Sequence, residues 1–475
     1  MPPAPPIDAT PLPGGRLSRE DFSRIHDRTA AILSRTGMWF GSEAAVALFR
    51  SRGFKTDGPV VFFHEAALEA ALASVASRFT LLGRNPAHTI TFHPDEIAVG
   101  MGRSAAFIVE NNQTRRKAAA NDFIELFKLA QALPAIRMMG NLVTPGDMPP
   151  AAVYPFMMVN QIRWSDKPYI FMDPGDIDLL CIAFGITRER MRADADRQIA
   201  YAQSTINPIS PLAVSGEQAD FLMLSAEYGM PVSLSPTPAT GSTGPCTLAG
   251  NVLLNNCEVL GLLVLSQLVR PGLPVFYGVF PSGIDMRTMA GTYGSPEARL
   301  MEAAAVRMAR FYGMLTRGNV GATDALTCDF QSGAESMFNF TTAMANRINH
   351  LPGCGHLGSF AAASKEKMVL DAEAAAYAGR WMRPMDLSDE ALAADLIQEI
   401  GPRGNFLTAR HTFANFRTEL HHPELFSRPT YEKWAAEGRD LAARAADTAD
   451  ALLAAYVPPD LDRETDKALA RFLAP

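Results

Sequence analysis

Acidic and imidazole side chains stand at or after the last two strands that the sequence predicts, where they could act on a bound molecule. Asp324, Glu335 and His350 are the clearest of these. A carboxylate or an imidazole held near a substrate can serve as a general acid or base, so we take these three as candidate catalytic residues. A helix cap or a loop hydrogen bond is the alternative for each, and Asp329, five residues after Asp324, need not face it.

Basic and aromatic side chains near the predicted strand ends could hold a small ligand. Arg103, Arg287 or His356 could bind a carboxylate through charge-assisted hydrogen bonds. Aromatic faces attract a quaternary ammonium group, although most of the aromatic residues must belong to the core. For His350 and His356 we favour single hydrogen-bonding roles over a metal pair. The candidate substrate-binding residues are Arg103, Phe107, Tyr154, Asn207, Tyr277, Arg287 and His356.

The segment 237–251, TPATGSTGPCTLAGN, is almost entirely small or polar and joins a strand-like run to a long apolar helical run. Small residues let a ligand approach the backbone closely. Other predicted strand ends share this composition, which indicates an open mouth that faces something wide and flat. Ordinary loop composition is the alternative. The glycines that we expect to face such a group are Gly241, Gly244, Gly318, Gly321 and Gly355.

These residues can meet only if the fold brings the strand ends together. Eight strand-like runs alternate with eight helical runs, which predicts a parallel sheet and allows closure into a (β/α)8 TIM barrel. An open doubly wound sheet is the competing architecture. The predicted strands cover 97–109, 136–143, 168–172, 198–206, 231–235, 274–280, 315–321 and 347–352. The helical runs cover 120–132, 151–164, 176–184, 216–228, 248–269, 296–312, 333–346 and 365–381.

The remaining segments flank the barrel. Residues 1–17 are rich in proline and are expected to form a disordered leader. Residues 18–95 predict a helical and β-hairpin extension, 96–385 the catalytic barrel, and 386–475 a helical C-terminal region packed on the barrel.

Composition excludes several classes of function. The net charge of −7 and the pI near 5.8 argue against nucleic-acid binding. No apolar stretch reaches the roughly 18 residues of a membrane span. The five cysteines lie far apart, which favours reduced thiols in the cytoplasm over disulfides or a zinc site. Motifs for phosphate loops, dinucleotide binding and nucleophile elbows are absent. Glu258, in an apolar helical run, is interpreted as part of a structural polar network.

Several long stretches resemble the trimethylamine methyltransferase (MttB-like) family, in its form without pyrrolysine. They include IHDRTAAILSRTGMWFGSEAAVALFRSRG, GSTGPCTLAGNVLLNNCEVLGLLVLSQLVRPGLPVFYG and TDALTCDFQSGAES, and the resemblance runs from about residue 19 to residue 472. It implies a TIM barrel that transfers a methyl group from a methylated amine to the cobalt of a corrinoid protein. The chain departs from the family at Leu326, where members often have lysine, and at Arg103, where they are more glycine-rich.

The resemblance also guides the expected substrate and partner. A quaternary ammonium leaves as a neutral tertiary amine and needs no proton, so a chain without pyrrolysine suits betaines better than trimethylamine. Glycine betaine is the first expectation, and proline betaine and carnitine remain open. No corrinoid-binding D-x-H-x-x-G pattern is present, so the corrinoid (cobalamin) is expected on a separate partner protein, with no metal site in this chain. We also expect a homo-oligomer.

Two other functions stay open at this stage. A barrel lyase or hydrolase could use Asp324 or Glu335 as a general base without any corrinoid. A betaine-binding or scaffold protein could keep the fold without catalysis, and Leu326 in place of the family lysine makes this alternative relevant.

Overall fold

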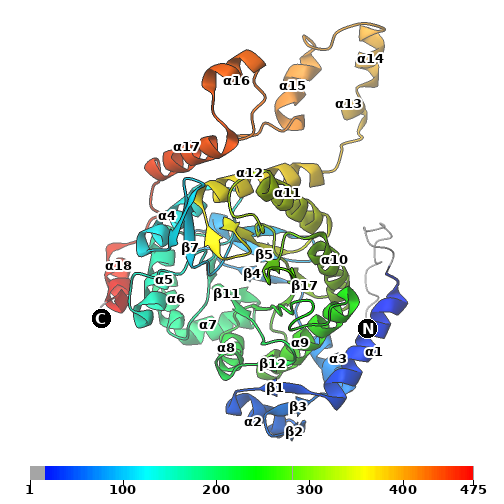
Figure 1. Ribbon diagram of the computed structural model, residues 1–475, viewed down its shortest axis with the longest axis vertical. Coiled ribbons are helices and arrows are strands. Elements are labelled where there is room, and N and C mark those ends of the chain that lie inside the picture. The colour runs from blue at the N-terminus through cyan, green and yellow to red at the C-terminus, as the bar shows by residue number, and fades with distance from the viewer. Residues whose placement is uncertain (1–16, 281, 474–475) are drawn as a thin grey trace.

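A computed structural model describes residues 17–280 and 282–473, so the predicted leader lies almost entirely outside the described residues. Its centre is a sheet of seven strands in the order β6-β18-β17-β14-β13-β11-β9, and every pair is parallel (Figure 1). The strands are β6 (Ala98–Met101), β9 (Tyr169–Ile170), β11 (Ala202–Ile206), β13 (Val232–Leu234), β14 (Val275–Gly278), β17 (Leu315–Arg317) and β18 (His350–Cys354).

The segment around Met138 closes this sheet into a ring. Met138 forms a parallel bridge with Gly100 of β6, and the Met139 amide donates to the Pro168 carbonyl beside β9 at 3.1 Å. The predicted second strand, 136–143, is thus present only as isolated bridges. From β9 to β18 the strand order follows the chain without the reversal of a doubly wound sheet, so the barrel prediction is confirmed.

Helices cover the outside of the ring (Figure 1). Side-chain caps start several of them: Ser215, Ser295, Asp329 and Ser364 each accept a hydrogen bond from a backbone amide of the first turn. The helices are α4 (Ala120–Ala132), α5 (Pro150–Trp164), α6 (Asp176–Phe184), α7 (Arg188–Ala195), α8 (Gly216–Glu227), α9 (Leu248–Val269), α10 (Pro296–Phe311), α11 (Phe330–Ala345) and α12 (Lys365–Met382).

Contrary to the expectation that no apolar stretch reaches the length of a membrane span, helix α9 is long and apolar enough to cross a membrane by length and composition alone, but most of it is buried inside the protein. Its Glu258 is fully buried and accepts hydrogen bonds from the Ser210 hydroxyl and the Leu212 amide, both at 2.8 Å. Burial raises the pKa of this carboxyl to about 7. Glu258 therefore fastens the loop after β11 to α9, in line with the structural role predicted for it.

The N-terminal extension closes the amino-terminal end of the barrel. The hairpin of β4 (Phe79–Leu81) and β5 (Ile90–Phe92) inserts Phe79 and Phe92 against Phe276 of β14, with ring centroids 5.6 and 5.1 Å apart. A cavity in the barrel can therefore open only at the carboxyl ends of the strands. The other elements are α1 (Arg19–Arg35), β1 (Met38–Phe40), α2 (Glu43–Ser51), β2 (Lys55–Asp57), β3 (Val60–Phe62) and α3 (Glu65–Ser74).

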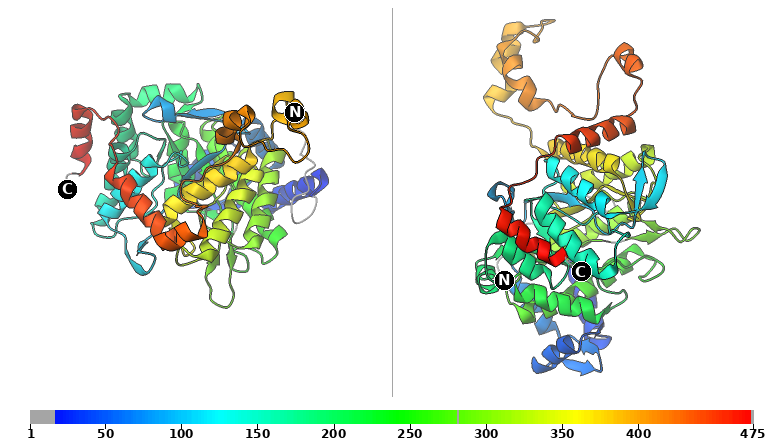
Figure 2. Two further views of the ribbon diagram at one scale, coloured as in Figure 1. Left: turned by 90° about the horizontal axis from the view of Figure 1, so that it is seen from above. Right: turned by 90° about the vertical axis from the view of Figure 1, so that its left-hand side faces the viewer.

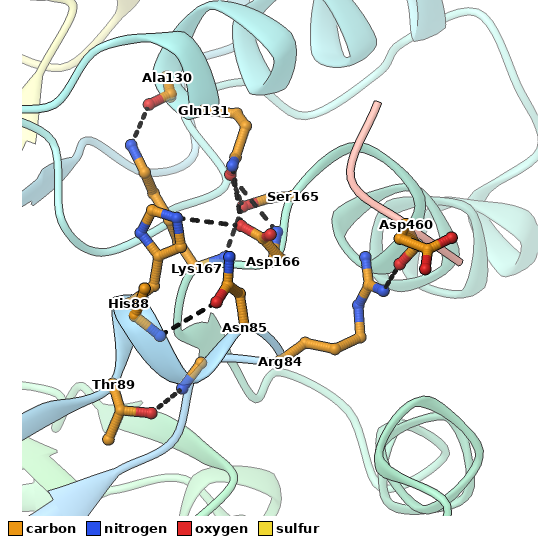
Figure 3. A network of polar contacts seen from close by, with 12 residues as sticks. Arg84, Asn85, His88, Thr89, Ala130, Gln131, Ser165, Asp166, Lys167 and Asp460 are labelled. Atoms are coloured by element: carbon orange, nitrogen blue, oxygen red, sulfur yellow. Dashed lines mark hydrogen bonds and ion pairs between the residues drawn. The ribbon is translucent and has the colours of Figure 1, made fainter. Parts of the chain in front are cut away.

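A polar network ties the extension and the C-terminal region to the barrel (Figure 3). Arg84, just after β4, donates to the Asp460 carbonyl and, from Nε, to the Tyr169 hydroxyl at 3.3 Å. Lys167 is buried, and its Nζ donates to three carbonyl groups at and after the end of α4, at 2.6 to 2.9 Å. These bonds satisfy backbone acceptors that would otherwise be buried without partners.

The C-terminal region has two parts with different surroundings. α17 (Leu441–Ala454) packs on α12 and α4, and α18 (Arg463–Ala470) on α5 and α6. Between α12 and α17, four short helices extend away from the barrel (Figures 1 and 2). They are α13 (Asp389–Leu392), α14 (Ala394–Ile400), α15 (Arg410–Glu419) and α16 (Tyr431–Glu437). α17, α18 and the segment around Leu425, whose amide donates to the Glu373 carboxylate of α12, pack on the barrel, whereas α13–α15 contain no buried residue.

Candidate active site

A cavity of about 320 Å³ lies at the carboxyl ends of the barrel strands. This is where barrel enzymes bind their substrates, because the loops after several strands meet there. Most of its lining follows β6, β11, β14, β17 and β18. The lining residues are Gly102, Arg103, Ser104, Thr205, Asn207, Thr237, Phe280, Tyr293, Arg317, Asn319, Pro352, Gly353, His356 and Phe360.

Two guanidinium groups dominate the charge of this cavity. Arg317 ends β17, is buried, and donates from Nη1 to the Ser235 hydroxyl at 3.2 Å, while its Nε has no hydrogen-bond partner. Arg103 follows β6. Burial lowers the pKa of both groups, and the charge of Arg103 adds to the effect on Arg317. Among the described residues neither forms an ion pair with a carboxylate. A buried guanidinium beside a second, partly exposed one, both without a counter-ion among the described residues, favours an anionic ligand.

Three aromatic rings form another wall of the cavity. The ring centroids of Tyr293 and Phe360 lie 4.5 Å apart, and those of Phe280 lie 5.4 Å from Phe360 and 5.9 Å from Tyr293. His356 adds a fourth ring, 4.7 Å from Phe360. Such faces attract a quaternary ammonium group, most strongly where water is excluded. The Arg317 guanidinium lies over the Phe280 ring, 5.4 Å from its centroid, so cationic and aromatic groups line the same cavity side by side.

Asp324 and Glu335 hold loops together beside the cavity. The Asp324 carboxylate accepts hydrogen bonds from the Tyr293 amide at 2.9 Å, the Gly294 amide at 3.0 Å and the Ser359 hydroxyl at 2.8 Å. Glu335 accepts from the Thr323 hydroxyl and, at 2.7 Å, from the Asp324 amide. The two carboxylates therefore fix the loops that carry Tyr293 and Phe360. We assign them positioning roles in place of the predicted role as general bases.

Replacing Asp324 with alanine is expected to weaken the binding of a quaternary ammonium ligand roughly 5- to 30-fold, because the loops that present Tyr293 and Phe360 lose their common acceptor. The estimate corresponds to about 1–2 kcal/mol of cation–π attraction. Calorimetric titration at several pH values measures it. An unchanged affinity, with turnover that falls and loses its pH dependence, would instead identify Asp324 as a general base.

The two candidate histidines are both buried, and burial disfavours their protonated forms. His356 lines the cavity, and its Nε2 lies 3.0 Å from the Arg103 carbonyl, so it fixes the loop that carries Arg103. Burial lowers its pKa to about 3. His350 lies on β18 against Phe276, with ring centroids 5.8 Å apart, among the side chains that fill the barrel. Burial, followed by the charges of Arg317 and Arg103, lowers its pKa well below the usual value.

The other predicted substrate-binding residues are scattered. Asn207 lines the cavity. Phe107 lies on the hairpin of β7 (Phe107–Glu110) and β8 (Thr114–Lys117), beneath the Arg115 guanidinium at 3.9 Å. Tyr154 on α5 is 48% exposed. Tyr277 is fully buried and donates to the Asn256 side chain of α9 at 2.9 Å. Phe107, Tyr154 and Tyr277 therefore do not line the cavity.

Arg287 also lies outside the cavity. It sits in the turn between β15 (Gly283–Ile284) and β16 (Gly291–Thr292), where its side chain is 88% exposed. Its guanidinium pairs with Asp285 at 3.0 Å. An ionic contact this exposed contributes little stability, and it leaves Arg287 without a role in holding a buried ligand.

The five glycines that the sequence predicted to face a wide, flat group have different surroundings in the structure. Gly241, with φ of +80°, and Gly244 lie in the loop after β13, where Gly244 is tightly enclosed by Asn251 and Pro238. A Cβ at Gly318 would lie 2.8 Å from the Glu302 carboxylate of α10, on the outside of β17. A Cβ at Gly321 would meet the Gly353 carbonyl, and one at Gly355 would lie 2.5 Å from Leu142. The last three glycines are explained by close packing.

Arg317, Phe280, Tyr293 and Phe360 form the centre of the cavity, yet none was selected as a site residue from the sequence. One signal was available for Arg317, because an arginine within a predicted barrel strand must either leave the sheet or face a polar cavity. Tyr293 and Phe360 lie in loops, whose residues show no periodicity that predicts where they point.

Fold and cavity define a (β/α)8 barrel protein with a binding site for a small ligand at the carboxyl ends of its strands. The chain belongs to the family described as trimethylamine methyltransferase (MTTB), whose family model matches residues 5–475. The predicted family membership is confirmed, and this membership makes the chain a methyltransferase.

Similar proteins support the same assignment. Glycine betaine methyltransferase of Desulfitobacterium hafniense (strain Y51) is 34% identical over 466 residues, which cover 96% of each chain. Proline betaine:corrinoid methyltransferase of Eubacterium limosum is 29% identical over 480 residues, again 96% of each chain. Among solved structures, the hydroxylamine complex of MtmB has a TM-score of 0.51 at 10% identity and covers 94% of this chain and 89% of its own. This last likeness concerns the fold alone.

Proposed function

We propose that this protein transfers a methyl group from a betaine, with glycine betaine as the first candidate, to the Co(I) centre of a corrinoid carried by a partner protein. The observation that carries the proposal is the cavity, in which neither Arg103 nor Arg317 pairs with a carboxylate of the described residues and in which aromatic rings also line the space. A ligand with a carboxylate and an onium group matches both features. The names of the two betaine relatives point in the same direction.

In this mechanism the chain binds and orients its substrate. Arg317 and Arg103 hold the carboxylate by charge-assisted hydrogen bonds, and Phe280, Tyr293 and Phe360 surround the onium group. The partner's corrinoid supplies the nucleophilic cobalt. The C–N bond breaks as the methyl group is transferred, and the bonding electron pair stays on nitrogen. The leaving amine is neutral, so the site needs no general acid, which agrees with carboxylates that act in positioning. Rate enhancement then comes from alignment and exclusion of water.

The partner would approach the open end of the barrel. The loop after β13, with Gly241 and Gly244, has little side-chain bulk there. Leu326 is 72% exposed on the loop that also carries Asp324, and Met286 and Met289 are exposed in the turn between β15 and β16. We assign these apolar side chains to contact with the corrinoid protein. Leu326, in place of the family lysine, would add apolar area where a charge would otherwise lie.

Two further expectations belong to this proposal. We place the protein in the cytoplasm, where the reduced cobalt that the reaction requires can be maintained and where its five free cysteines stay reduced. We also propose a homo-oligomer, for which a specific surface is described below.

A methyl-transfer assay tests the proposed function. The purified protein is mixed with cob(I)alamin, or with a reduced corrinoid protein, and with glycine betaine, proline betaine, carnitine, choline or trimethylamine. We expect methylcobalamin absorbance with one or more of the betaines and little with choline or trimethylamine, which have no carboxylate. Substrate binding without any absorbance change would favour a binding protein. Breakdown of a substrate without corrinoid would favour a lyase or hydrolase.

A further inference from the structure

The segment 383–438, which we call the arm, leaves the barrel after α12 and returns at α17. Figures 1 and 2 show it standing beyond α11 and α12, at the side of the ring. Its helices α13, α14 and α15 contain no buried residue. The four helices α13–α16 have only 4, 7, 10 and 7 residues. Helices this short are not stable in water without tertiary packing. The stretch 418–426 packs on α12 of its own chain, where Leu425 is buried and Tyr377 contacts Phe426. The helices α13–α15 bury no side chain in this way and therefore need another surface.

The arm is also unusually apolar for an exposed segment. Ten of its large apolar side chains are between 43% and 84% exposed. Single exposed apolar residues are normal on a protein surface, but a concentration in one projecting segment marks an interaction site. The exposed residues are Met385, Leu387, Leu392, Ile397, Phe406, Leu407, Phe413, Leu420, Tyr431 and Trp434.

The charges of the arm indicate which partner covers it. Its outgoing limb, 386–399, contains five acidic residues and no lysine or arginine: Asp386, Asp389, Glu390, Asp395 and Glu399. Its returning limb, 400–418, contains Arg403, Arg410 and Arg417 and no acidic residue. If a two-fold axis passes between the arms of two copies, the acidic limb of each copy lies against the basic limb of the other. Such self-complementarity is what an isologous dimer interface requires.

The base of the arm offers a second apolar surface. Phe338 of α11 and Trp381 of α12 are exposed, at 43% and 62%. Beside them lies a cavity of about 500 Å³ between α11, α12 and the start of α17. Met337 and Leu370 line it from α11 and α12, and Phe426 lines it from this chain's own arm. This α11–α12 face points toward the same side of the barrel as the arm. It can receive the apolar side chains of an arm that belongs to another copy.

We propose that the arm is a dimerisation element, and that two copies of this chain exchange arms. Each arm packs on the arm and the α11–α12 face of the other copy, with apolar side chains at the centre and paired acidic and basic limbs around them. The inference does not depend on the methyl-transfer reaction. The corrinoid partner approaches the open end of the barrel and does not compete for this surface.

Light scattering coupled to size exclusion, with full-length protein at micromolar concentration and low salt, tests the proposal. The wild type should be a dimer or a higher assembly of dimers. The double variant Leu407→Asp/Phe413→Asp should raise the dissociation constant at least about 100-fold, since apolar residues at an interface centre contribute most of the affinity. Circular dichroism of the barrel verifies that this variant folds. A monomeric wild type, or a variant that remains dimeric, would overturn the proposal.

Charge reversal separates self-association from binding of a different protein. One variant carries Asp389→Lys, Asp395→Lys and Glu399→Lys, so that both limbs are basic. The other carries Arg403→Glu, Arg410→Glu and Arg417→Glu, so that both are acidic. Each alone should dissociate, and an equimolar mixture should form heterodimers, because opposite limbs face each other again. A control with three reversed charges on the extension, Arg24→Glu, Arg28→Glu and Arg52→Glu, should dimerise normally. Failure of the mixture to associate would contradict arm exchange between copies.

Discussion

Replacing Arg317 with methionine should lower kcat/KM for glycine betaine roughly 10- to 100-fold. Hydrogen bonds to charged groups contribute about 1.5–3 kcal/mol, and about 1.4 kcal/mol corresponds to a factor of ten. Methionine keeps most of the apolar volume at the end of β17 but removes the donors that face the ligand. The loss should appear mainly as weaker substrate binding, so calorimetric titration of the variant should show the same fold-change. Arg103→Met should act in the same direction.

Arg287→Met provides the matched control for this prediction. Arg287 is the third basic residue that the sequence suggested for the carboxylate, but its guanidinium is exposed and pairs with Asp285. Its replacement should leave kcat/KM within about twofold of the wild type. If Arg287→Met disrupted binding while Arg317→Met did not, the carboxylate would have to bind outside the cavity, and the proposed site would be wrong.

Replacing Lys367 with methionine should destabilise the protein by about 3–5 kcal/mol, the cost of leaving a buried charge without its partner. Lys367 and Asp371 of α12 are each only 1% exposed, with Nζ 2.5 Å from Oδ1. Lys367 also donates to the Gly321 carbonyl at 3.0 Å, and Asp371 accepts from the Gly355 amide at 2.8 Å. The pair thus anchors the loops after β17 and β18, which both contribute to the cavity. Denaturant unfolding measures the loss.

Lys365→Met is the control, two residues earlier on the same helix. Lys365 is 35% exposed and lies 3.5 Å from both Glu125 and Asp450. Exposed pairs of this kind contribute at most about 1 kcal/mol. The double variant Lys367→Met/Asp371→Leu should recover part of the stability lost in Lys367→Met, because it removes the stranded charge. Equal destabilisation by Lys365→Met and Lys367→Met would show that the buried pair is not the anchor we describe.

Strand and helix periodicity was enough to predict the barrel, because each βα unit buries its apolar face against its neighbours. The second predicted strand, around Met138, was harder to place. Parallel bridges at Gly100–Met138 and Ala105–Val143 join this segment to β6 and the residues just after it, but between them Gly140 lies so close to the Gly102 carbonyl that the ladder is interrupted. The projecting arm also could not be predicted, since its apolar residues have the same pattern as helices that pack on a core. The arm helices differ from core helices only in the surface against which their apolar residues pack, and the local sequence does not specify that surface.

The sequence predicted the end of the barrel at which the site lies and some of its lining residues, but not the arginine and the aromatic residues that contribute most to it. Arg103, Asn207 and His356 lie in the lining of the cavity as expected for residues at strand ends. Tyr277 was selected for its aromatic ring, but successive residues of a strand point to opposite faces, and its side chain faces α9. Phe276 points into the barrel instead, where the N-terminal hairpin covers it. The loops that carry Tyr293 and Phe360 are held at the cavity by hydrogen bonds from the Tyr293 amide and the Ser359 hydroxyl to Asp324. No local sequence pattern predicts these tertiary contacts.

The most direct test of the account is the affinity of the wild-type protein for ligands that differ only in the carboxylate. Calorimetric titration with glycine betaine, choline and tetramethylammonium at neutral pH and fixed salt makes the comparison. If Arg103 and Arg317 hold the carboxylate while the aromatic rings hold the onium group, glycine betaine should bind at least about tenfold more tightly than the other two. Equal affinity for all three would show that the guanidinium pair does not bind the substrate, and would contradict the central claim.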